Sequence, residues 1–313
     1  MTKPKVLVTF GDPNGIGPEI ALAAAAELAR EERLTPVLVG DGHVARRIAD
    51  LLDIDLGALE LLDVEGLSAA DHSPGHPTAA SGRATVRYLE AAIGALDATG
   101  AVGIVGCPHS ETAINLTGRP FSGYPNLLAE LQGSGPDSVI LMLVGGGLRI
   151  SHVTLHEPIL TALGRITPEL VANTIRVTVR GLNRLGLNLP RIGVMGFNPH
   201  AGEGGLFGDE DDRLVLPGVD VARAEGIDVI GPEGADVLLG RDNIDAFIAL
   251  YHDQGHIPVK LMSGRNISAL SLGSDVLFSS VGHGAAFDIA GSGVASHAAV
   301  LRTVKIVGGI DGV

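Results

Sequence analysis

Short runs of apolar, often β-branched residues alternate along the chain with longer stretches in which apolar positions recur every three or four residues. The first pattern is typical of buried strands and the second of amphipathic helices, so their alternation predicts an α/β fold. The strands predicted in this way are Lys5 to Thr9, Pro36 to Gly40, Val102 to Val105, Ser138 to Val144, Ile192 to Met195 and Phe247 to Tyr251.

Two helices carry clear signals. One begins after Thr167, where a hydroxyl cap precedes Pro168 at the first helical position, and Gly186 is its expected stop. The other is expected from about Thr78 to Leu96, because its apolar residues form a single stripe. We expect both helices to pack against the core.

Length and composition narrow the class of protein. A chain of 313 residues with 45% hydrophobic content can bury a large core, and its length favours two domains. The segment Gly133 to Pro136 is a candidate crossing between them. The formal charge of -14 disfavours binding to nucleic acid or to anionic membranes, which favours a small-molecule ligand. Glycine, at 44 residues, has about twice its usual share, which indicates many tight loops.

The absence of a targeting signal makes the cytoplasm the expected location, and the cysteine content limits the possible metal ligands. The first ten residues have too short an apolar run for a signal peptide, and no stretch approaches the roughly 20 apolar residues of a membrane span. The single Cys107 excludes an internal disulfide and a cysteine cluster for zinc, and we expect it to be a buried small hydrophobe. Any metal must therefore bind histidine and carboxylate.

Two glycine-rich turns follow predicted strands. In Gly11 to Glu19, free backbone N–H groups at a helix start could hold an anion or a nucleotide, or the segment is simply a tight turn. The segment Gly40 to Ala45 fits the dinucleotide pattern G-x-G-x-x-A, with Asp63 or Glu65 as a possible ribose ligand. In so glycine-rich a chain, such a pattern also arises by chance.

Histidines follow three of the apolar runs. His156, His200 and His252 each lie just beyond a strand-like segment, and the ends of parallel strands converge at one edge of a sheet. These three could form one metal site, and imidazole ligands favour zinc or a similar transition metal over magnesium. Lys260 follows the third histidine and could hold a carboxylate or transfer a proton. Four histidines stay open as alternatives: His109, His152, His256 and His283.

Four segments together resemble the PdxA-like family, the 4-hydroxythreonine-4-phosphate dehydrogenase family: Gly11 to Glu19, Asn198 to Gly205, Tyr251 to Gly255 and Val281 to Gly284. The resemblance implies the two-domain fold of isocitrate and isopropylmalate dehydrogenases, with the active site in the interdomain cleft. It also implies a homodimer with metal ligands from both subunits, and NAD held without a Rossmann fingerprint. The expected domains are 1–134 with 296–313, and 135–295, the second of which carries the metal ligands and the dimer contacts.

The resemblance assigns roles to residues. It also implies that the glycine pattern from Gly40 to Ala45 serves packing and does not bind a nucleotide. Asp253 is a possible partner that tunes Lys260. The expected metal ligands are His156, His200 and His252, the catalytic residues Lys260 and Asp253, the cofactor-binding residues Asn198 and Asp236, and the substrate-binding residues His109, Tyr124, Pro125, Asn126 and Lys260.

This chain also departs from the family members that act on phosphates. Those members have Gly-His-Thr-Glu where this chain has Gly123-Tyr124-Pro125-Asn126. By an ungapped count, Ala269 and Phe278 stand where the family would place a substrate asparagine and arginine. Loss of a phosphate-site arginine predicts a less charged, flatter ligand. The segments Cys107 to Ala113, Ser122 to Pro125 and Leu141 to Ile150 resemble instead the terephthalate dihydrodiol dehydrogenase branch.

That branch implies a function in the catabolism of aromatic compounds: NAD-dependent oxidative decarboxylation of terephthalate 1,2-cis-dihydrodiol to protocatechuate. We expect zinc to lower the pKa of the alcohol, hydride to pass to the nicotinamide, and the resulting β-keto acid to lose carbon dioxide. The base, the metal, the stereochemistry and the choice of NAD or NADP stay open. Three alternatives remain: a family member acting on 4-hydroxythreonine 4-phosphate or on D-threonate or D-erythronate 4-phosphate, a metal-dependent decarboxylase or lyase without nicotinamide, and a non-catalytic binder.

Overall fold

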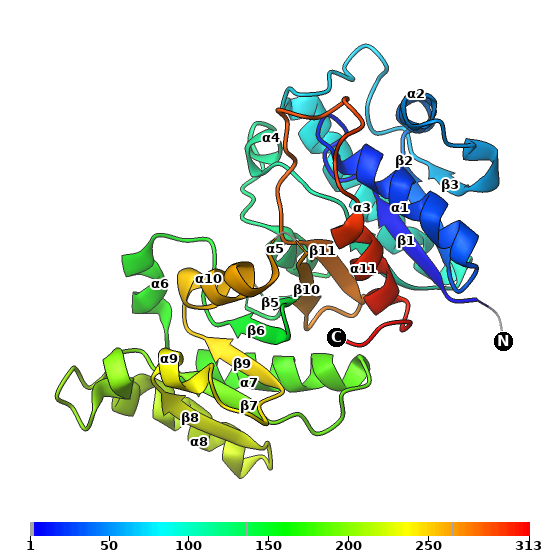
Figure 1. Cartoon of the computed structure of the whole chain (residues 1–313). Helices are drawn as coiled ribbons and strands as arrows, with labels where there is room; N and C mark the ends of the chain where they lie inside the picture. Colours follow the sequence, from blue (N-terminus) through cyan, green and yellow to red (C-terminus); the bar gives the residue numbers. More distant parts are fainter. Residues whose placement is uncertain (1–2, 136, 265) are drawn as a thin grey trace. The chain divides into compact units, whose positions relative to one another are not determined.

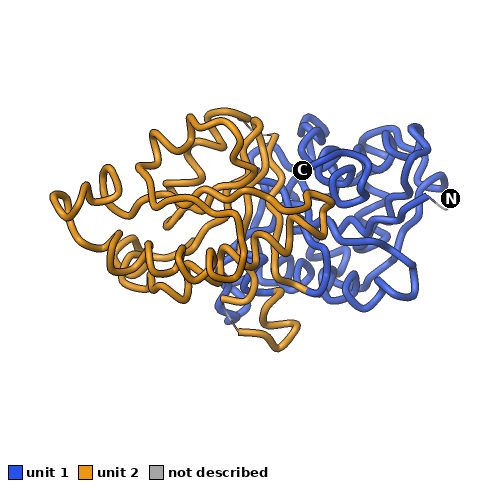
Figure 2. Tube along the Cα trace, turned by 90° about the horizontal axis from the view of Figure 1, so that it is seen from below, with its two compact units in different colours: residues 1–127, 275–312 blue, residues 128–274, 313 orange. Residues whose placement is uncertain are grey.

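The computed structural model describes residues 3–135, 137–264 and 266–313 (Figure 1). The chain forms two compact units, residues 1–127 with 275–312 and residues 128–274 with 313 (Figure 2). The boundaries expected from the sequence were 134/135 and 295/296, so in the structure the return to the first unit comes 21 residues earlier (274/275). Pro136, at the end of the expected crossing, lies outside the described residues.

The first unit is built on a parallel sheet with the strand order β3-β2-β1-β4-β11. Helix α1 packs against both α2 and α11, while α3 packs against β1 and β4. The elements are β1 (Lys5–Thr9), α1 (Gly17–Glu31), β2 (Thr35–Gly40), α2 (Gly42–Leu52), the 3-10 turn η1 (Leu56–Ala58), β3 (Glu60–Asp63), α3 (Ala79–Thr99), β4 (Ala101–Gly106), α4 (Glu111–Asn115), α5 (Tyr124–Leu131, which contains the first boundary), β11 (Phe278–Val281) and α11 (Ala298–Val307).

The helix expected from Thr78 is α3, and its ends follow from local chemistry. The Thr78 side chain accepts a hydrogen bond from the Ser81 backbone N–H, and the Ser81 hydroxyl accepts one from the Thr78 N–H, which forms a reciprocal cap. At the other end, Gly100 has a φ of +65°, a backbone conformation that glycine adopts without strain. The helix is therefore three residues longer at its C-terminus than expected.

The second unit has six described strands in the order β10-β5-β6-β9-β7-β8. Strands β6, β9, β7 and β8 are parallel to one another, whereas β5 is antiparallel to both of its neighbours, β10 and β6. The elements are β5 (Ile140–Gly145), β6 (Leu148–His152), α6 (Ile159–Arg165), α7 (Pro168–Arg184), β7 (Ile192–Met195), the 3-10 turn η2 (Pro199–Gly202), the π-helical turn η3 (Asp211–Val215), α8 (Leu216–Ala224), β8 (Val229–Glu233), α9 (Ala235–Leu238), β9 (Ala246–Ala249), α10 (His252–Ser263) and β10 (Ser268–Leu272).

Both faces of this second sheet are buried. Along β5, Ile140, Met142 and Val144 belong to one apolar cluster, and Leu141 and Leu143 belong to another. This alternation follows from the period of two in a strand, and it explains why β5 reads as an unbroken apolar run. Helices α7 and α10 pack against this sheet, and α7 begins at the Thr167 cap that the sequence predicts. Among the described residues, no helix is long and apolar enough to cross a membrane.

Candidate metal and substrate site

Three parallel neighbours in the second unit, β6, β9 and β7, have their carboxyl ends at the same edge of the sheet. His156 lies four residues beyond β6, and His252 opens α10 just after β9. His200 lies in η2, the turn that follows β7. The topology therefore brings all three expected metal ligands to one sheet edge, as the sequence predicts from strand ends.

Within one chain, three histidines form a close group: His156, His252 and His256, whose ligand atoms all lie within 4.8 Å of one another. Two nitrogens bound to one zinc ion at about 2.05 Å each are at most about 4.1 Å apart, so the group is only slightly wider than a set of ligands on one ion. The ring centroids of His156 and His252 are 5.4 Å apart. Two imidazoles on a tetrahedral zinc ion have centroids about 5 Å apart, so this pair is already well placed.

His200 does not belong to that group among the described residues. Its side chain is 64% exposed, and its Nδ1 lies 2.9 Å from a carboxylate oxygen of Glu203. The hydrogen bond to Glu203 raises the pKa of His200. His200, Ala201 and Glu203 all have a φ between 44° and 53°, which is uncommon for residues with side chains and concentrates at functional sites.

A carboxylate at Nδ1 fixes the tautomer of two of the expected ligands, His252 and His200. The Nδ1 of His252 lies 2.7 Å from the Asp253 carboxylate, in the same way that His200 meets Glu203. Because a carboxylate only accepts hydrogen bonds, each Nδ1 carries the proton and each Nε2 keeps its lone pair. Carboxylate partners of this kind are usual for metal-binding histidines. Asp253 thus contacts His252, whereas the sequence suggested Lys260 as its partner.

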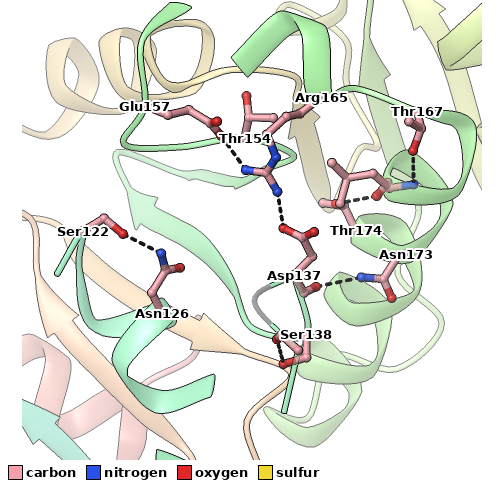
Figure 3. Close-up of polar contacts among 12 residues, drawn as sticks. Ser122, Asn126, Asp137, Ser138, Thr154, Glu157, Arg165, Thr167, Asn173 and Thr174 are labelled. Atoms are coloured by element: carbon pink, nitrogen blue, oxygen red, sulfur yellow. Dashed lines mark hydrogen bonds and ion pairs between the residues drawn. The ribbon is translucent and has the colours of Figure 1, made fainter. Parts of the chain in front are cut away.

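A pocket of about 300 Å³ opens beside this group, and its lining includes His156, His252, Asp253, Tyr251 and Glu157. Glu157 is bound by Arg165 at 2.7 Å, and Arg165 also binds Asp137 at 2.6 Å (Figure 3). These two carboxylates raise the pKa of Arg165, so the guanidinium stays charged and neutralises Glu157. The pocket therefore offers imidazoles and one negatively charged Asp253 side chain in place of a cluster of carboxylates.

Lys260 lies two helical turns beyond His252 on α10, and it is exposed. Burial is the main cause that lowers the pKa of His256 to about 2, and the charges of nearby histidines and of Lys260 contribute to the same shift. Lys260 therefore lies close enough to the histidine group to act on its charge. Positions four residues apart share one face of a helix, which places His252, His256 and Lys260 on the same side of α10.

The anion site considered for Gly11 to Glu19 is contradicted by the hydrogen bonds of that turn. The backbone N–H groups of Asp12, Gly15 and Ile16 all donate to backbone carbonyls. The buried Asp12 carboxyl accepts from the Asn14 N–H and the Ser81 hydroxyl, and burial raises its pKa to about 6. A buried carboxyl and paired N–H groups disfavour an anion, so this segment is a tight turn.

At the dinucleotide pattern beginning at Gly40, carboxylates of this chain use the backbone donors, which favours packing over nucleotide binding. The Asp63 carboxylate accepts a 2.7 Å hydrogen bond from the Gly42 N–H, at the N-terminus of α2 where a pyrophosphate would bind. Asp41 accepts hydrogen bonds from Gly66, Leu67 and the Tyr88 hydroxyl. Carboxylates of this chain therefore occupy the donors that a nucleotide would need.

The substrate residues expected in the first unit gather around Tyr124, which begins α5. Tyr124 is 2% exposed, and its hydroxyl donates to the Cys107 carbonyl at 3.0 Å. Its ring centroid lies 4.5 Å from that of His109 and 4.8 Å from that of Phe278. A Cβ atom on Gly106 would lie 2.7 Å from the Phe278 ring and 3.0 Å from the Tyr124 ring, so glycine at the end of β4 makes room for both rings.

The other residues that the sequence analysis singled out are buried or contact a residue nearby in the chain. Pro125 is buried, and the exposed Asn126 donates to the Ser122 hydroxyl (Figure 3). Ala269 lies in the apolar core of the second unit. Cys107 is buried, and burial raises the pKa of its thiol, so it is inert, as expected.

The two cofactor candidates follow β7 and β8, which are neighbouring strands of the second unit. The Asn198 side chain donates to Glu210 at 2.7 Å, and its backbone N–H donates to Asp211 at 2.8 Å. Asp236 is exposed in the first turn of α9, and its charge contributes to the raised pKa of His200. His256 is the site residue that the sequence left among the alternatives; its spacing of four from His252 was the available signal.

Residues 32–307 of this chain match the family model described as "Pyridoxal phosphate biosynthetic protein PdxA". The chain belongs to the PdxA family. It is 44% identical to a 1,2-dihydroxy-3,5-cyclohexadiene-1,4-dicarboxylate dehydrogenase of a Comamonas species, over 98% of both chains. This member of the PdxA family is a dehydrogenase, as the resemblance in its sequence predicts.

Solved structures of the family confirm the α/β fold. A terephthalate 1,2-cis-dihydrodiol dehydrogenase from Burkholderia xenovorans LB400 is 46% identical over 98% of both chains, with a TM-score of 0.71. A 4-hydroxythreonine-4-phosphate dehydrogenase from Klebsiella pneumoniae is 32% identical over 99% of this chain and 98% of that one, with a TM-score of 0.85.

Proposed function

We propose that this protein catalyses the NAD-dependent oxidative decarboxylation of terephthalate 1,2-cis-dihydrodiol (1,2-dihydroxycyclohexa-3,5-diene-1,4-dicarboxylate) to protocatechuate. Two relatives whose names state this type of substrate match nearly the whole chain at 44% and 46% identity. The 4-hydroxythreonine-4-phosphate dehydrogenase from Klebsiella pneumoniae matches at 32%. The sequence resemblance to the dihydrodiol branch points the same way.

The contact between Tyr124 and Phe278 is the observation that carries the choice of substrate. These are the positions where members that act on phosphates are expected to have a histidine and an arginine. Here the two rings pack on each other at 4.8 Å, and both are buried. A phosphate would find no guanidinium at this place, and introducing one would bury a charge at high cost. The aromatic pair supports a ligand without phosphate.

The chemistry of the donor set fits a zinc ion. His156 and His252 have the centroid separation of two ligands, and Asp253 leaves the Nε2 lone pair of His252 available. We assign His156, His252 and His200 as the residues that would hold the metal. When bound, zinc would lower the pKa of the substrate hydroxyl and polarise the ketone for decarboxylation, while NAD would accept the hydride.

The chain's own residues would orient the substrate around that centre. Lys260, on the same face of α10 as His252, is our choice for binding a substrate carboxylate and for delivering a proton. Asp253 holds the imidazole of His252 through Nδ1, and Arg165 keeps Glu157 neutralised at the pocket wall. Asn198 and Asp236 remain our candidates for binding the cofactor, since Asp63 fills the N-terminus of α2.

We further propose a homodimer in which His200 completes the site of a second copy. In the described residues His200 is exposed and lies outside the histidine group. Large apolar side chains are exposed on the helix that follows His156 and on the helix that carries His252: Leu160 (84%) on α6, and Leu261 (80%) and Met262 (65%) on α10. Exposed apolar residues on the helices next to two of the ligands fit a surface that a second copy covers.

Mixing inactive variants tests the shared site. His200→Ala and the double variant His156→Ala/His252→Ala are each expected to lack activity. Dimers formed from one chain of each would contain one intact site, so mixing after brief dissociation should restore activity to about a quarter of wild type. Light scattering should give twice the mass of one chain. No restored activity in verified mixed dimers would place all the ligands in one chain.

A coupled assay tests the reaction itself. The zinc-loaded protein is supplied with NAD and enzymatically prepared terephthalate cis-dihydrodiol, and reduced cofactor and protocatechuate are followed together. We expect both products in equal amounts. Turnover of a phosphorylated hydroxy acid in place of the diol would overturn the substrate assignment, and release of carbon dioxide without NAD would indicate a non-redox decarboxylase.

A further inference from the structure

His256 is the third member of the histidine group, and its ring lies flat on that of His252. The two rings are stacked, with centroids 3.6 Å apart and an angle of 14° between their planes. His256 follows His252 by four residues on α10, so the stack joins consecutive turns of one helix. His256 is 7% exposed, whereas His156 is exposed and the side chain of His252 is 33% exposed.

This stacking decides against His252 and His256 as ligands of the same ion. The lone pair of an imidazole nitrogen lies in the plane of its ring, and a zinc ion lies about 2.05 Å away along it. An ion midway between two parallel rings would lie about 1.8 Å out of each plane, half of the 3.6 Å separation, which is nearly the whole bond length. The ring centroids of His156 and His252, 5.4 Å apart, have about the 5 Å separation expected for two ligands of one ion. The centroids of His252 and His256, 3.6 Å apart, do not.

A second buried histidine, His152, contacts His256 through a hydrogen bond. The Nδ1 of His256 lies 3.1 Å from the Nε2 of His152 and 3.2 Å from the backbone carbonyl of His252. The other nitrogen of His152, Nδ1, lies 3.3 Å from the Leu141 carbonyl. A carbonyl only accepts, so His152 donates through Nδ1 and must accept through Nε2 from the Nδ1–H of His256. Burial lowers the pKa of both histidines, to about 3 for His152 and about 2 for His256, which agrees with two neutral rings.

Glycine at position 255 makes this contact possible. A Cβ atom there would lie 2.4 Å from the Nε2 of His152 and 2.9 Å from the Ile150 side chain. Real Cβ atoms do not approach so closely, so any larger residue would push α10 away from the end of β6. The missing side chain is what lets the buried His152 reach His256.

We propose that His256, anchored by His152, is a positioning residue for the metal site: it stacks on His252 and fixes the direction of that ring, without binding the metal itself. The inference rests on the metal site of the proposed function. His252 is then held at its Nδ1 by Asp253 and over one ring face by His256, which leaves its Nε2 as the only atom free to turn toward a metal.

Metal binding by the full-length protein tests this without using activity. Zinc affinity is measured by competition with a chromophoric chelator, and the imidazole ligands of the bound zinc are counted by X-ray absorption. In His256→Phe a flat ring remains, so affinity should stay within a few-fold of wild type. In His256→Ala and His152→Leu, affinity should fall about 10- to 100-fold, the range for residues that orient a ligand. The imidazole count should stay the same in all three.

The matched control is His72→Leu in the first unit, since His72 is also a buried histidine bonded to a backbone carbonyl, that of Pro13 at 3.2 Å. Its zinc affinity should equal that of wild type. Loss of one imidazole in His256→Phe would make His256 a ligand, and unchanged affinity in His256→Ala and His152→Leu would remove the positioning role. Failure of the diol assay with this pattern of zinc affinities intact would overturn only the proposed reaction, whereas a wild-type protein that binds no zinc would overturn both.

Discussion

The two units place polar residues in the same topological position, just beyond the carboxyl ends of parallel strands, but they use them differently. In the first unit, Asp12 and Asp41 follow β1 and β2, and both are buried with hydrogen bonds to their own chain. In the second unit, His156 follows β6 and His252 follows β9, and each remains partly or fully exposed beside a pocket.

The difference lies in how many of a group's hydrogen-bonding positions the fold already uses. The Asp12 carboxyl has internal donors at both oxygens, so it stabilises a turn and has little left to bind a ligand. Among the described residues, the imidazole of His252 has a hydrogen-bond partner at Nδ1 only, and this partner prepares Nε2 for a metal. A strand-end position therefore indicates a functional residue only when its partners leave one side open.

Removal of His252 should have the largest effect on the second unit. We expect His252→Ala to lower zinc affinity by more than about 100-fold, beyond the range for residues that only orient ligands, and to abolish turnover. Chelator competition measures the affinity, and circular dichroism checks the fold. His297→Ala, which removes a histidine bound to Glu27 in the first unit, should leave zinc affinity unchanged. Equal affinity of the two variants would exclude His252 as a ligand.

In the first unit, the aromatic pair should matter mainly for stability. Phe278 is fully buried against Tyr124, so Phe278→Ala should lower the free energy of unfolding by about 3 to 5 kcal/mol. Urea denaturation measures this. Leu116→Ala, at an apolar side chain that is 58% exposed, should change it by no more than about 0.5 kcal/mol. A loss below about 1 kcal/mol for Phe278→Ala would show that the pair is not a packed core.

Asp12 should make stability depend on pH. Its pKa is raised from 3.8 to about 6 in the folded protein. The contribution of the protonated carboxyl to the free energy of unfolding is therefore fully present below pH 3.8 and is lost as the pH rises through 6. The variant Asp12→Asn removes this loss. Its unfolding free energy relative to wild type should therefore rise by up to about 3 kcal/mol between pH 4 and pH 7. A constant difference across this range, measured by urea denaturation, would contradict the buried ionisation.

The smallest effect is expected at the exposed His200. Glu203 is the main cause of its raised pKa and Asp236 a minor one. In the metal-free protein, Glu203→Gln should lower the pKa of His200 toward its ordinary value, and Asp236→Asn should lower it less. An NMR titration of the imidazole protons measures both. An equal effect of the two variants would argue against the His200–Glu203 hydrogen bond.

Local sequence signals were sufficient for much of the fold. The strands β1, β2, β4, β5, β7 and β9 and the helices α3 and α7 lie where apolar period and capping residues predict them, because their signals act within a few residues. The short strands β3, β8 and β11 have no comparable signal. They form because a neighbouring strand supplies hydrogen bonds to them, as β4 does for β11.

The features of the site also divide into those that the sequence predicts and those that depend on the tertiary structure. The sequence by itself determined that histidines stand just beyond strand-like segments, that a single cysteine excludes an internal disulfide, and that the chain resembles the PdxA family. Only the tertiary structure decided which histidines meet. The stack of His256 on His252 and its hydrogen bond to His152 depend on how closely α10 approaches β6 at Gly255, a distance set by packing between segments about 100 residues apart. Likewise, the carboxylate at the N-terminus of α2 comes from Asp63. Only the folded chain shows that this carboxylate already uses the Gly42 N–H of the matching glycine pattern.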